Sequence, residues 1–506
     1  MTTLKLLFSQ NVGTGRLESL LQKATCLYIG VPALLFVFGW LQWWLAGPLA
    51  TAIAWAFWKN WNAREENDAQ GKLEENRITV WSLVLCFVLA AWWGGYSGAG
   101  GLAAQTQDWT KHMAVFKDLS TFSWPVVFSI PFVEKPVPLA YYHGYYLLPA
   151  LVTKYAGWTV GCYVWMGLTM LGTGLVGLWF AALVGRKVWL LPMLFALFGG
   201  LDFLGTFILE PKLQAWDFHY EWWAAFSIVQ YPSNGSLIVW VPQHALAGWL
   251  ATCMLMQSAR HGRGFGCAGL VCGLVSIWSP FAFLGLIPFL LLEIVRRIRD
   301  DRWRDLLTVA NLSGLIFAAV VALFLSAHAH DIPKSWLWQA WDIKHFWVVV
   351  LLFFLFEFVI YSLFSNELWS SSVKNWRAWG RTTFVVLMLF PWYRMGGFND
   401  LLMRGSIPAL TVLWVFIARD LLVRRWNTNT RILALFLCFG AVTGGSELIR
   451  TWGSFPAEKP LPRREAAHVW QLESVIAQQY EGTLDSFFWR HLARPWAAQK
   501  ENELTE

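Results

Sequence analysis

Long apolar runs recur along nearly the whole chain and constrain its fold more than any other feature. A helix needs about 20 apolar residues to cross the hydrocarbon of a bilayer. Since 57% of the 506 residues are hydrophobic and only 14% are charged, an ordinary soluble domain and a disordered chain are both excluded. We therefore predict an all-α, polytopic transmembrane bundle. Its apolar runs are 26–58, 79–100, 158–184, 188–208, 236–257, 264–295, 306–326, 346–365, 382–393, 407–423 and 431–447.

Two of these runs are too long for one span and carry a proline inside them. Run 26–58 contains Gly47-Pro48, and run 264–295 contains Ser279-Pro280. Because proline removes a backbone donor and interrupts the helical ladder, each run is predicted to be a helical hairpin. The chain would then cross the membrane about thirteen times.

Lysine and arginine gather in alternate short connections, as the positive-inside rule requires of cytoplasmic loops. The pattern predicts an integral protein of a bacterial inner membrane, with a cytoplasmic N-terminus and an extracytoplasmic active site. The same rule accounts for the net charge of +7, so we expect membrane lipids and no nucleic acid as partners. We divide the chain into an N-terminal anchor, hairpin and linker (1–78), a transmembrane catalytic module (79–450) and an extracytoplasmic tail (451–506).

The first long outer connection, residues 101–157, carries acids and histidines just after a span. Asp108 and His112 are four residues apart, so a helix would place them on one face. A carboxylate here can activate an acceptor hydroxyl as a general base or bind a divalent metal, and we predict Asp108 and His112 as catalytic residues. A salt bridge to Lys111 is the alternative for Asp108. The amphipathic stretch around Asp118 predicts a helix that lies on the membrane surface.

The second outer connection, residues 209–235, mixes ionisable and aromatic side chains. Asp217, His219 and Glu221 would point one way on an extended segment, whereas a helix would pair Asp217 with Glu221. Either geometry offers ligands for a divalent cation such as Mg²⁺ or Mn²⁺, or groups that hold sugar hydroxyls beside Trp222. No fixed metal-ligand signature is present, so both interpretations stay open and the cofactor is unknown.

Two polar residues fall inside the apolar runs. Asp202 follows two glycines in run 188–208, where a carboxylate is either functional or hydrogen-bonded across a close helix contact. His244 follows Pro242, which predicts a kink. The kink would aim the imidazole into a cavity, or the ring would bond to a neighbouring helix.

Two arginines are predicted at the outer border of two short spans. Arg394 and Arg404 suit planar, bidentate recognition of phosphate, although interfacial snorkelling would also place arginines there. Asp400 lies four residues before Arg404 and would hold its guanidinium in position.

This pattern resembles the GT-C superfamily of membrane glycosyltransferases, which use polyprenyl-phosphate sugars. The resemblance rests on the number of spans, the short cytoplasmic links, the long first outer loop and the lone acid after a span in Gln107-Asp108-Trp109. It covers residues 79–450 by architecture. The chain departs from the family pattern in the extra hairpin at 26–58 and in the lack of a paired-acid motif.

The resemblance implies an inverting glycosyltransferase that moves a sugar from a polyprenyl-phosphate donor to a lipid or cell-envelope glycan acceptor. Asp108 would match the acceptor-activating carboxylate of the family. The phosphate that leaves with the lipid would be neutralised by arginine. The substrate-binding residues would be Asp217, His219, Glu221, Trp222, His244, Arg394 and Arg404.

Two other functions stay open. One is acyl or phosphoglycerol transfer with His244 as the base. The other is a polytopic lipid or solute transporter, which would need broken helices that meet inside the membrane. Gly47-Pro48 and Ser279-Pro280 are the interruptions that would correspond.

Overall fold

The computed structural model describes residues 11–62, 77–130, 135–209, 219–221, 229–340, 345–452 and 465–498. Six of its helical segments are long and apolar enough to cross a membrane, which indicates a membrane protein. The prediction of a helical bundle is confirmed, whereas the count of about thirteen spans is not. The six segments are Thr14–Trp40 (α2), Val80–Ser97, Trp158–Val184 (α8), Phe346–Phe364, Asp400–Leu422 and Thr428–Thr451.

The other bounds complete the description of the helices. Within the spans lie α5 (Val80–Gly94), α16 (Phe346–Phe354), α17 (Ile360–Phe364), α20 (Asp400–Gly405), α21 (Ile407–Leu422) and α22 (Thr428–Trp452). A π-helical turn, Leu355–Val359, joins α16 to α17. The remaining helices are α3 (Trp43–Asn62), α6 (Asp108–Thr121), α7 (Gly144–Ala156), α9 (Leu191–Ala196), α10 (Asp202–Leu209), α11 (Asn234–Trp240), α12 (Pro242–His261), α13 (Phe265–Leu274), α14 (Pro280–Arg299), α15 (Val309–Leu325), α18 (Asn366–Ser370), α19 (Trp376–Leu389) and α23 (Ser474–Ala477).

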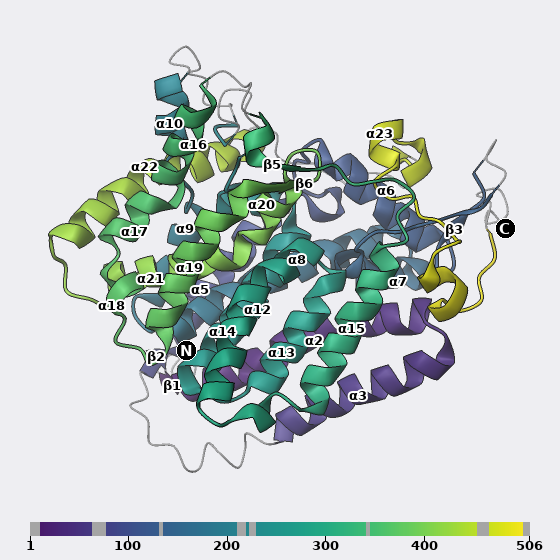
Figure 1. The fold of residues 1–506 in the computed structure, drawn as a ribbon, viewed down its shortest axis with the longest axis horizontal. Coiled ribbons are helices and arrows are strands. Elements are labelled where there is room, and N and C mark those ends of the chain that lie inside the picture. The colour runs from purple at the N-terminus through teal and green to yellow at the C-terminus, as the bar shows by residue number, and fades with distance from the viewer. Residues whose placement is uncertain are drawn as a thin grey trace, which may run out of the picture.

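The described strands form three short antiparallel pairs. They are β1 (Asn11–Gly13) with β2 (Arg77–Thr79), β3 (Val127–Phe128) with β4 (Val137–Pro138), and β5 (Lys334–Trp336) with β6 (Tyr393–Met395). α6, α20 and α23 lie at one end of the bundle, which we call the site end, and β1 and β2 lie at the other (Figure 1). One hydrophobic core extends from Leu17 to Ala493, so the three predicted segments of the chain pack together.

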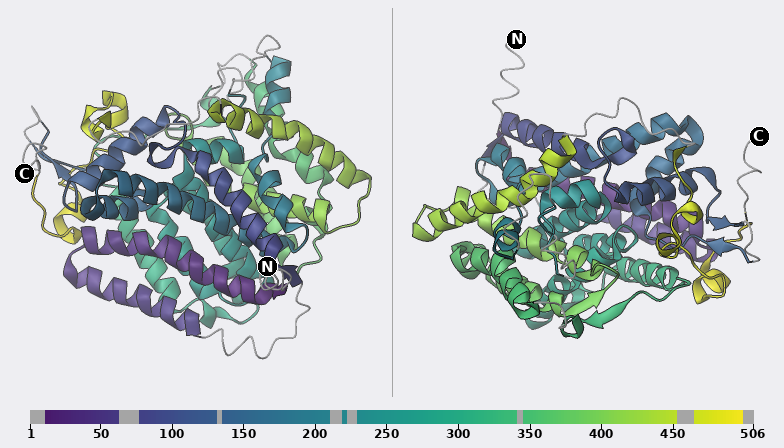
Figure 2. Two further views of the ribbon diagram at one scale, coloured as in Figure 1. Left: turned by 180° about the vertical axis from the view of Figure 1, so that it is seen from behind. Right: turned by 90° about the horizontal axis from the view of Figure 1, so that it is seen from above.

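Both predicted hairpins are present, but one of them turns at an unexpected place. α2 and α3 run side by side along one face of the bundle (Figure 2). Their turn is at Leu41 and Gln42, and Pro48 lies inside α3. The C-terminal segment favours this turn because Gln42 N donates to the carbonyl of Leu492. The prediction of a break at Gly47-Pro48 was therefore wrong.

The second hairpin breaks where the sequence predicts. α13 ends at Leu274 and α14 begins at Pro280. Ser279 caps α14, since its Oγ accepts from Ala282 N at 3.0 Å. Run 188–208 is in contrast two short helices, α9 and α10, and not a single span, because the chain leaves the helical conformation around Gly199 and Gly200.

Glycines bring the central helices close together. A Cβ on Gly177 of α8 would lie 2.9 Å from the Cβ of Ala90 on α5, and one on Gly174 would lie 2.3 Å from the ring of Phe87. Small residues at such positions let helices approach within a membrane. The α5–α8 pair therefore forms a fixed support for the first loop.

The predicted surface helix around Asp118 is present as α6 but is not on a surface. Its residues from His112 to Ser120 are buried, and Asp118 is 0% exposed. The C-terminal segment covers it: Lys117 donates to the carbonyl of Ala466 at 2.8 Å, and His468 bonds Asp118 at 2.5 Å. The sequence could not indicate this cover, which lies about 350 residues further on.

The segment 465–498 binds several parts of the site end. Its backbone joins the first loop through Ala140 N to Tyr480 O, and it joins the end of α15 through Thr483 N to Ala327 O at 2.7 Å. Tyr480 is buried beside Tyr141, with ring centroids 4.5 Å apart. We call 465–498 the strap.

We expect His468→Ala to release the strap from α6. The change leaves the buried Asp118 carboxyl with the N–H of Val469 but without its imidazole partner, which costs about 3 kcal/mol of stability. Thermal unfolding in detergent and limited proteolysis of the strap would measure it. Arg490→Ala, which removes an exposed pair with Asp485 in the same segment, should change neither; equal proteolysis of both variants would contradict the anchoring role.

Candidate functional site

Asp108 begins α6 at the site end. Its Oδ1 pairs with Lys111 Nζ at 2.6 Å, and its side chain is 22% exposed, so the predicted alternative of a salt bridge is present. Burial alone raises the pKa of the carboxyl, but Lys111, His112 and, more weakly, Arg404 outweigh it and bring the pKa below its ordinary value. Asp108 is therefore an ionised, partly accessible carboxylate at neutral pH.

His112 lies one turn after Asp108 on the same face of α6, as predicted. Its Nδ1 is 2.6 Å from the hydroxyl of Tyr146, and its Nε2 is 3.0 Å from the carbonyl of Trp240. A carbonyl only accepts, so Nε2–H donates to Trp240 and Nδ1 accepts from Tyr146. Burial lowers the pKa of His112 to about 4, so the ring is neutral. Because both ring nitrogens are hydrogen-bonded, we interpret His112 as a residue that positions Tyr146 and Trp240.

His244 lies in the first turn of α12, after the predicted kink. Val241 leaves the helical conformation ahead of Pro242. The imidazole bonds Ser279 Oγ at 2.6 Å and the hydroxyl of Tyr142 at 3.1 Å. Of the two predicted roles, the bond to a neighbouring helix is the one found, because Ser279 precedes α14.

Arg404 is the cation of this cluster. Asn399, in the left-handed conformation, caps α20, and the following turns bring Arg404 onto the Asp400 carboxylate as predicted. Gly396 makes room for this pair: its φ is +90°, and a Cβ there would lie 1.9 Å from Asp400 Oδ2. The buried Nε of Arg404 has no protein partner among the described residues.

Electrostatic interactions join Arg404 to the other predicted residues. They link it to Asp108, His112 and Tyr142, to His244, and to Tyr480 of the strap. The structure thus brings four predicted site residues together from α6, α12 and α20. We call this set the aspartate–arginine cluster: Asp108, His112, Tyr142, His244 and Arg404.

Arg394 takes no part in these contacts. It lies in β6, opposite Ser335 of β5. Burial lowers the pKa of its guanidinium, and its buried Nε has no protein partner within the described ranges. The structure therefore does not bring the guanidinium groups of Arg394 and Arg404 together.

A second group of charges surrounds His219. Its Nδ1 is 2.5 Å from Glu447 Oε1, and its Nε2 is 3.9 Å from Glu221 Oε2. Glu447 also accepts from the indole of Trp240 at 3.0 Å and from Arg450 at 3.3 Å. We call His219, Glu221, Glu447 and Arg450 the glutamate cluster. Burial opposes the protonated imidazole, but Glu447 and Glu221 outweigh burial and raise the pKa of His219.

Glu221 ties its loop to the start of α11. It accepts from Ser233 N at 2.7 Å, Ser236 Oγ at 2.6 Å and Gln230 Nε2 at 2.6 Å. Burial raises the pKa of Glu221 to about 7, although His219 opposes this. With three donors already bound, Glu221 supports the loop.

A cavity of about 340 Å³ is lined by Trp240 and by His219 and Arg450 of the glutamate cluster. Trp240 links this cluster to the aspartate–arginine cluster, because its carbonyl accepts from His112 and its indole donates to Glu447. The cavity reaches Gln107, the residue next to Asp108. It is lined by Ala104, Gln105, Thr106, Gln107, His219, Trp240, Arg450 and Thr451.

Two predicted residues, Asp217 and Trp222, lie outside the described residues. Within the described part of the chain, no group of three or more His, Cys, Asp or Glu side chains is arranged to hold a metal ion. We assign no chemical step to a metal.

Sequence reasoning missed several residues of the site. Glu447 is a lone carboxylate at the end of the apolar run 431–447, and the rule applied to Asp202 would have found it. Tyr142 had no signal beyond its aromatic neighbours. Tyr480 of the strap had none, because its contact with the site depends on the fold.

Asp202 does not line the cavity and lies among buried acids. It begins α10 and is 0% exposed. A Cβ on Gly200 would lie 2.0 Å from Glu357 Oε2 and 3.1 Å from Asp202 Oδ2, so both carboxyls face this glycine. Glu357 is in the π-helical turn. Such turns are frequent at functional sites.

Comparisons with known proteins leave the family open. No protein-family model and no solved structure matches this chain. It is 25% identical to y4nK of Sinorhizobium fredii (strain NBRC 101917 / NGR234), a protein described as uncharacterised, in an alignment 392 residues long that covers 67% of this chain. The chain spans 57% of the length of that relative.

We expect the stabilising effect of His219 to depend on pH. Its pKa is raised in the folded state, so its contribution is complete below the unfolded pKa of about 6.5 and is lost as pH rises through the folded pKa. The difference in Tm between wild type and His219→Gln should thus be largest near pH 6 and shrink towards pH 9. His330→Gln, at an exposed histidine, is the control. A pH-independent difference would contradict the charged pair.

Proposed function

We propose that this chain is an inverting membrane glycosyltransferase that transfers a sugar from a polyprenyl-phosphate donor to a lipid or glycan hydroxyl. The observation that carries the proposal is that Asp108 and Arg404 interact electrostatically, while Gln107, next to Asp108, lines a cavity. Nearly 300 residues separate the two charges in the sequence. Asp108 supplies an ionised carboxylate, and Arg404 a partly buried cation whose buried Nε has no protein partner among the described residues.

The chemistry assigned to Asp108 is general-base catalysis. An acceptor hydroxyl displaces Lys111 from one carboxylate oxygen, and Asp108 takes its proton as the oxygen attacks the anomeric carbon. The bond from that carbon to the phosphate oxygen breaks, and its electron pair stays on the phosphate. Because the pKa of Asp108 is lowered, its carboxylate is ionised and can accept the proton.

Arg404 is assigned to the leaving phosphate. Negative charge builds on the phosphate oxygen as the sugar departs, and a fixed cation stabilises this charge. Asp400 holds one side of the guanidinium, while the free Nε–H provides a donor for the phosphate. Arg394 would contact the same lipid further from the bond that breaks.

The cavity lined by Trp240 and His219 is assigned to the sugar. Gln107 offers its amide, and Gln105, whose amide nitrogen donates to the carbonyl of Gly98 at 2.9 Å, offers its amide oxygen. Asp217, Glu221 and Trp222 belong to the loop that carries His219 and complete the proposed binding region. The proposal includes about thirteen spans, an extracytoplasmic site and a bacterial inner membrane.

A transporter is the second candidate, favoured by a specific feature. The break between α9 and α10 lies beside two buried carboxyls, Asp202 and Glu357, and the latter is in a π-helical turn. Broken helices and buried acids mark ion-coupled sites in transporters. Acyl transfer by His244 has less support, since both of its ring nitrogens are engaged.

We expect Asp108→Asn to reduce transfer by about 100-fold or more, because the amide cannot accept a proton. The assay uses the protein in nanodiscs, polyprenyl-phosphate hexoses as donors and a membrane lipid extract as acceptor. Mass spectrometry measures the polyprenyl phosphate that is released. Asp305→Asn, at an exposed pair, is the matched control. Full activity of Asp108→Asn would remove this residue from the mechanism. Solute flux into vesicles without transfer would favour the transporter.

We expect Arg404→Ala to raise the donor KM about tenfold, since one charge-assisted contact to phosphate is lost. Asp400→Asn should give a smaller rise, because it only loosens the guanidinium. The readouts are the donor KM and kcat in the same assay, with Arg299→Ala, a change at an exposed arginine, as control. An unchanged donor KM would contradict the phosphate role of Arg404.

A further inference from the structure

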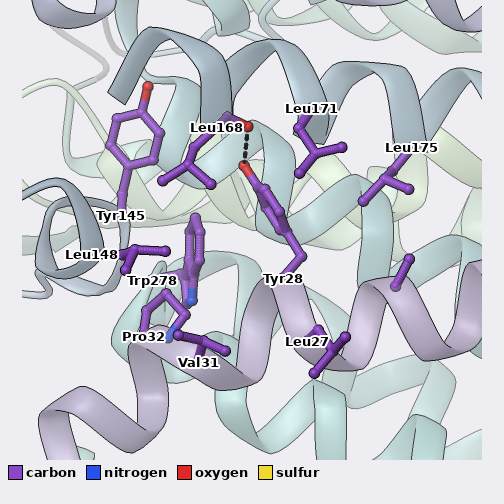
Figure 3. Close-up of a pocket in the computed structure, with 11 residues that line it drawn as sticks. Leu27, Tyr28, Val31, Pro32, Tyr145, Leu148, Leu168, Leu171, Leu175 and Trp278 are labelled. Carbon is purple, nitrogen blue, oxygen red and sulfur yellow. Dashed lines mark hydrogen bonds between the residues drawn. The ribbon is translucent and has the colours of Figure 1, made fainter. Parts of the chain in front are cut away.

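A second cavity, of about 290 Å³, lies between α2, α7 and α8. Leu27, Tyr28 and Val31 approach it from α2, and Leu168 and Leu171 face them from α8 (Figure 3). Tyr145 and Trp278 close its inner side. α2 belongs to the extra N-terminal hairpin, so half of this cavity is built by the part of the chain that departs from the GT-C pattern.

The lining of this cavity offers apolar contact but no polar partner. The hydroxyl of Tyr28 donates to the carbonyl of Leu168 at 3.0 Å (Figure 3). The hydroxyl of Tyr145 is 2.7 Å from Thr169 Oγ1, and the indole N–H of Trp278 donates to the backbone of α2 at 3.3 Å. The polar atoms of all three aromatic residues are thus engaged within the protein. A ligand here must be a hydrocarbon.

The mouth of this cavity faces the middle of the bilayer. Leu27 and Leu171 flank it, with 51% and 40% of their surface exposed. Each lies midway along a 27-residue helix that is long enough to span a membrane. The centre of the hydrocarbon is about 15 Å from either headgroup region. A ligand therefore enters sideways as a chain, and its headgroup stays outside the cavity.

The inner wall connects this cavity to the aspartate–arginine cluster. Tyr145 precedes Tyr146, which bonds His112 at 2.6 Å. Trp278 precedes Ser279, which bonds His244 at 2.6 Å. A hydrocarbon chain in the cavity thus contacts and supports the rings of Tyr145 and Trp278. The residues that follow them in the sequence hold the two histidines in place.

We propose that this cavity binds one acyl chain of a bilayer phospholipid. Arg404 is not among the residues that line the cavity, so the cavity does not hold a phosphate bound at Arg404. The end of an acyl chain does reach the middle of the bilayer. This inference does not depend on the proposed sugar transfer.

Thermal unfolding of the full-length protein, delipidated in detergent, tests the proposal. Dipalmitoyl phosphatidylglycerol should raise Tm saturably by about 3 °C. Dioctanoyl phosphatidylglycerol has the same headgroup and should give a much smaller rise, because its chains end before the middle of the bilayer. Equal shifts from both lipids would overturn the proposal, since the headgroup would then be what binds.

Three variants of α2 locate the effect. Val31→Trp fills the cavity and should abolish the response to the palmitoyl lipid, whereas Leu20→Trp, exposed on the same helix, should keep it. Ala24→Leu is a smaller filling change, for use if Val31→Trp does not fold, and it should weaken the response. A full response in the filled variant would overturn the proposal. So would a saturable shift with polyprenyl phosphate alone, which would assign the cavity to the carrier lipid.

Discussion

The break between α11 and α12 at Val241 determines how the site is built. Proline at 242 disfavours the helical conformation of the residue before it, and Val241 accordingly leaves it. The carbonyl of Trp240 is then available to His112 at 3.0 Å. The indole of the same residue donates to Glu447, and Arg450 lies over its ring at 5.5 Å. Trp240, the last residue of α11, thus joins α6 to α22.

The charges at the two ends of the bundle differ in how completely they are paired. Away from the site, Glu367 receives Arg419 at 2.9 Å, Arg424 at 2.6 Å and Ser371 at 2.8 Å. That network satisfies its carboxylate and has a structural role. Arg404 differs, because one face of its guanidinium is held by Asp400 while its Nε–H has no protein partner among the described residues. A buried donor of this kind favours an anionic ligand.

The sequence could predict features that depend on local chemistry. The i to i+4 spacing of Asp108 and His112, the break at Ser279-Pro280 and the kink at Pro242 all follow from short-range rules, and all are present. The rest of the site depends on contacts between residues that are far apart in the sequence. His219 and Glu447 are 228 residues apart, and nothing in either segment indicates the other. α6 was predicted to lie on the membrane surface because its pattern is amphipathic, but its Lys117 and Asp118 bond the strap instead of facing water. Burial of Asp118 follows only when His468 is in place.

The many aromatic residues of this chain acquire a second role from this arrangement. Tryptophan and tyrosine suit a boundary between an apolar and a polar region, because one edge of each ring is apolar and the other forms hydrogen bonds. Here such a boundary runs inside the protein as well as at the membrane interface. Tyr145 and Trp278 face the lipid cavity, while the next residues, Tyr146 and Ser279, hold the histidines. In each pair, the first residue therefore faces the hydrocarbon and the next one contacts the aspartate–arginine cluster. A displacement of the cavity wall would thus also displace the cluster, and the reverse.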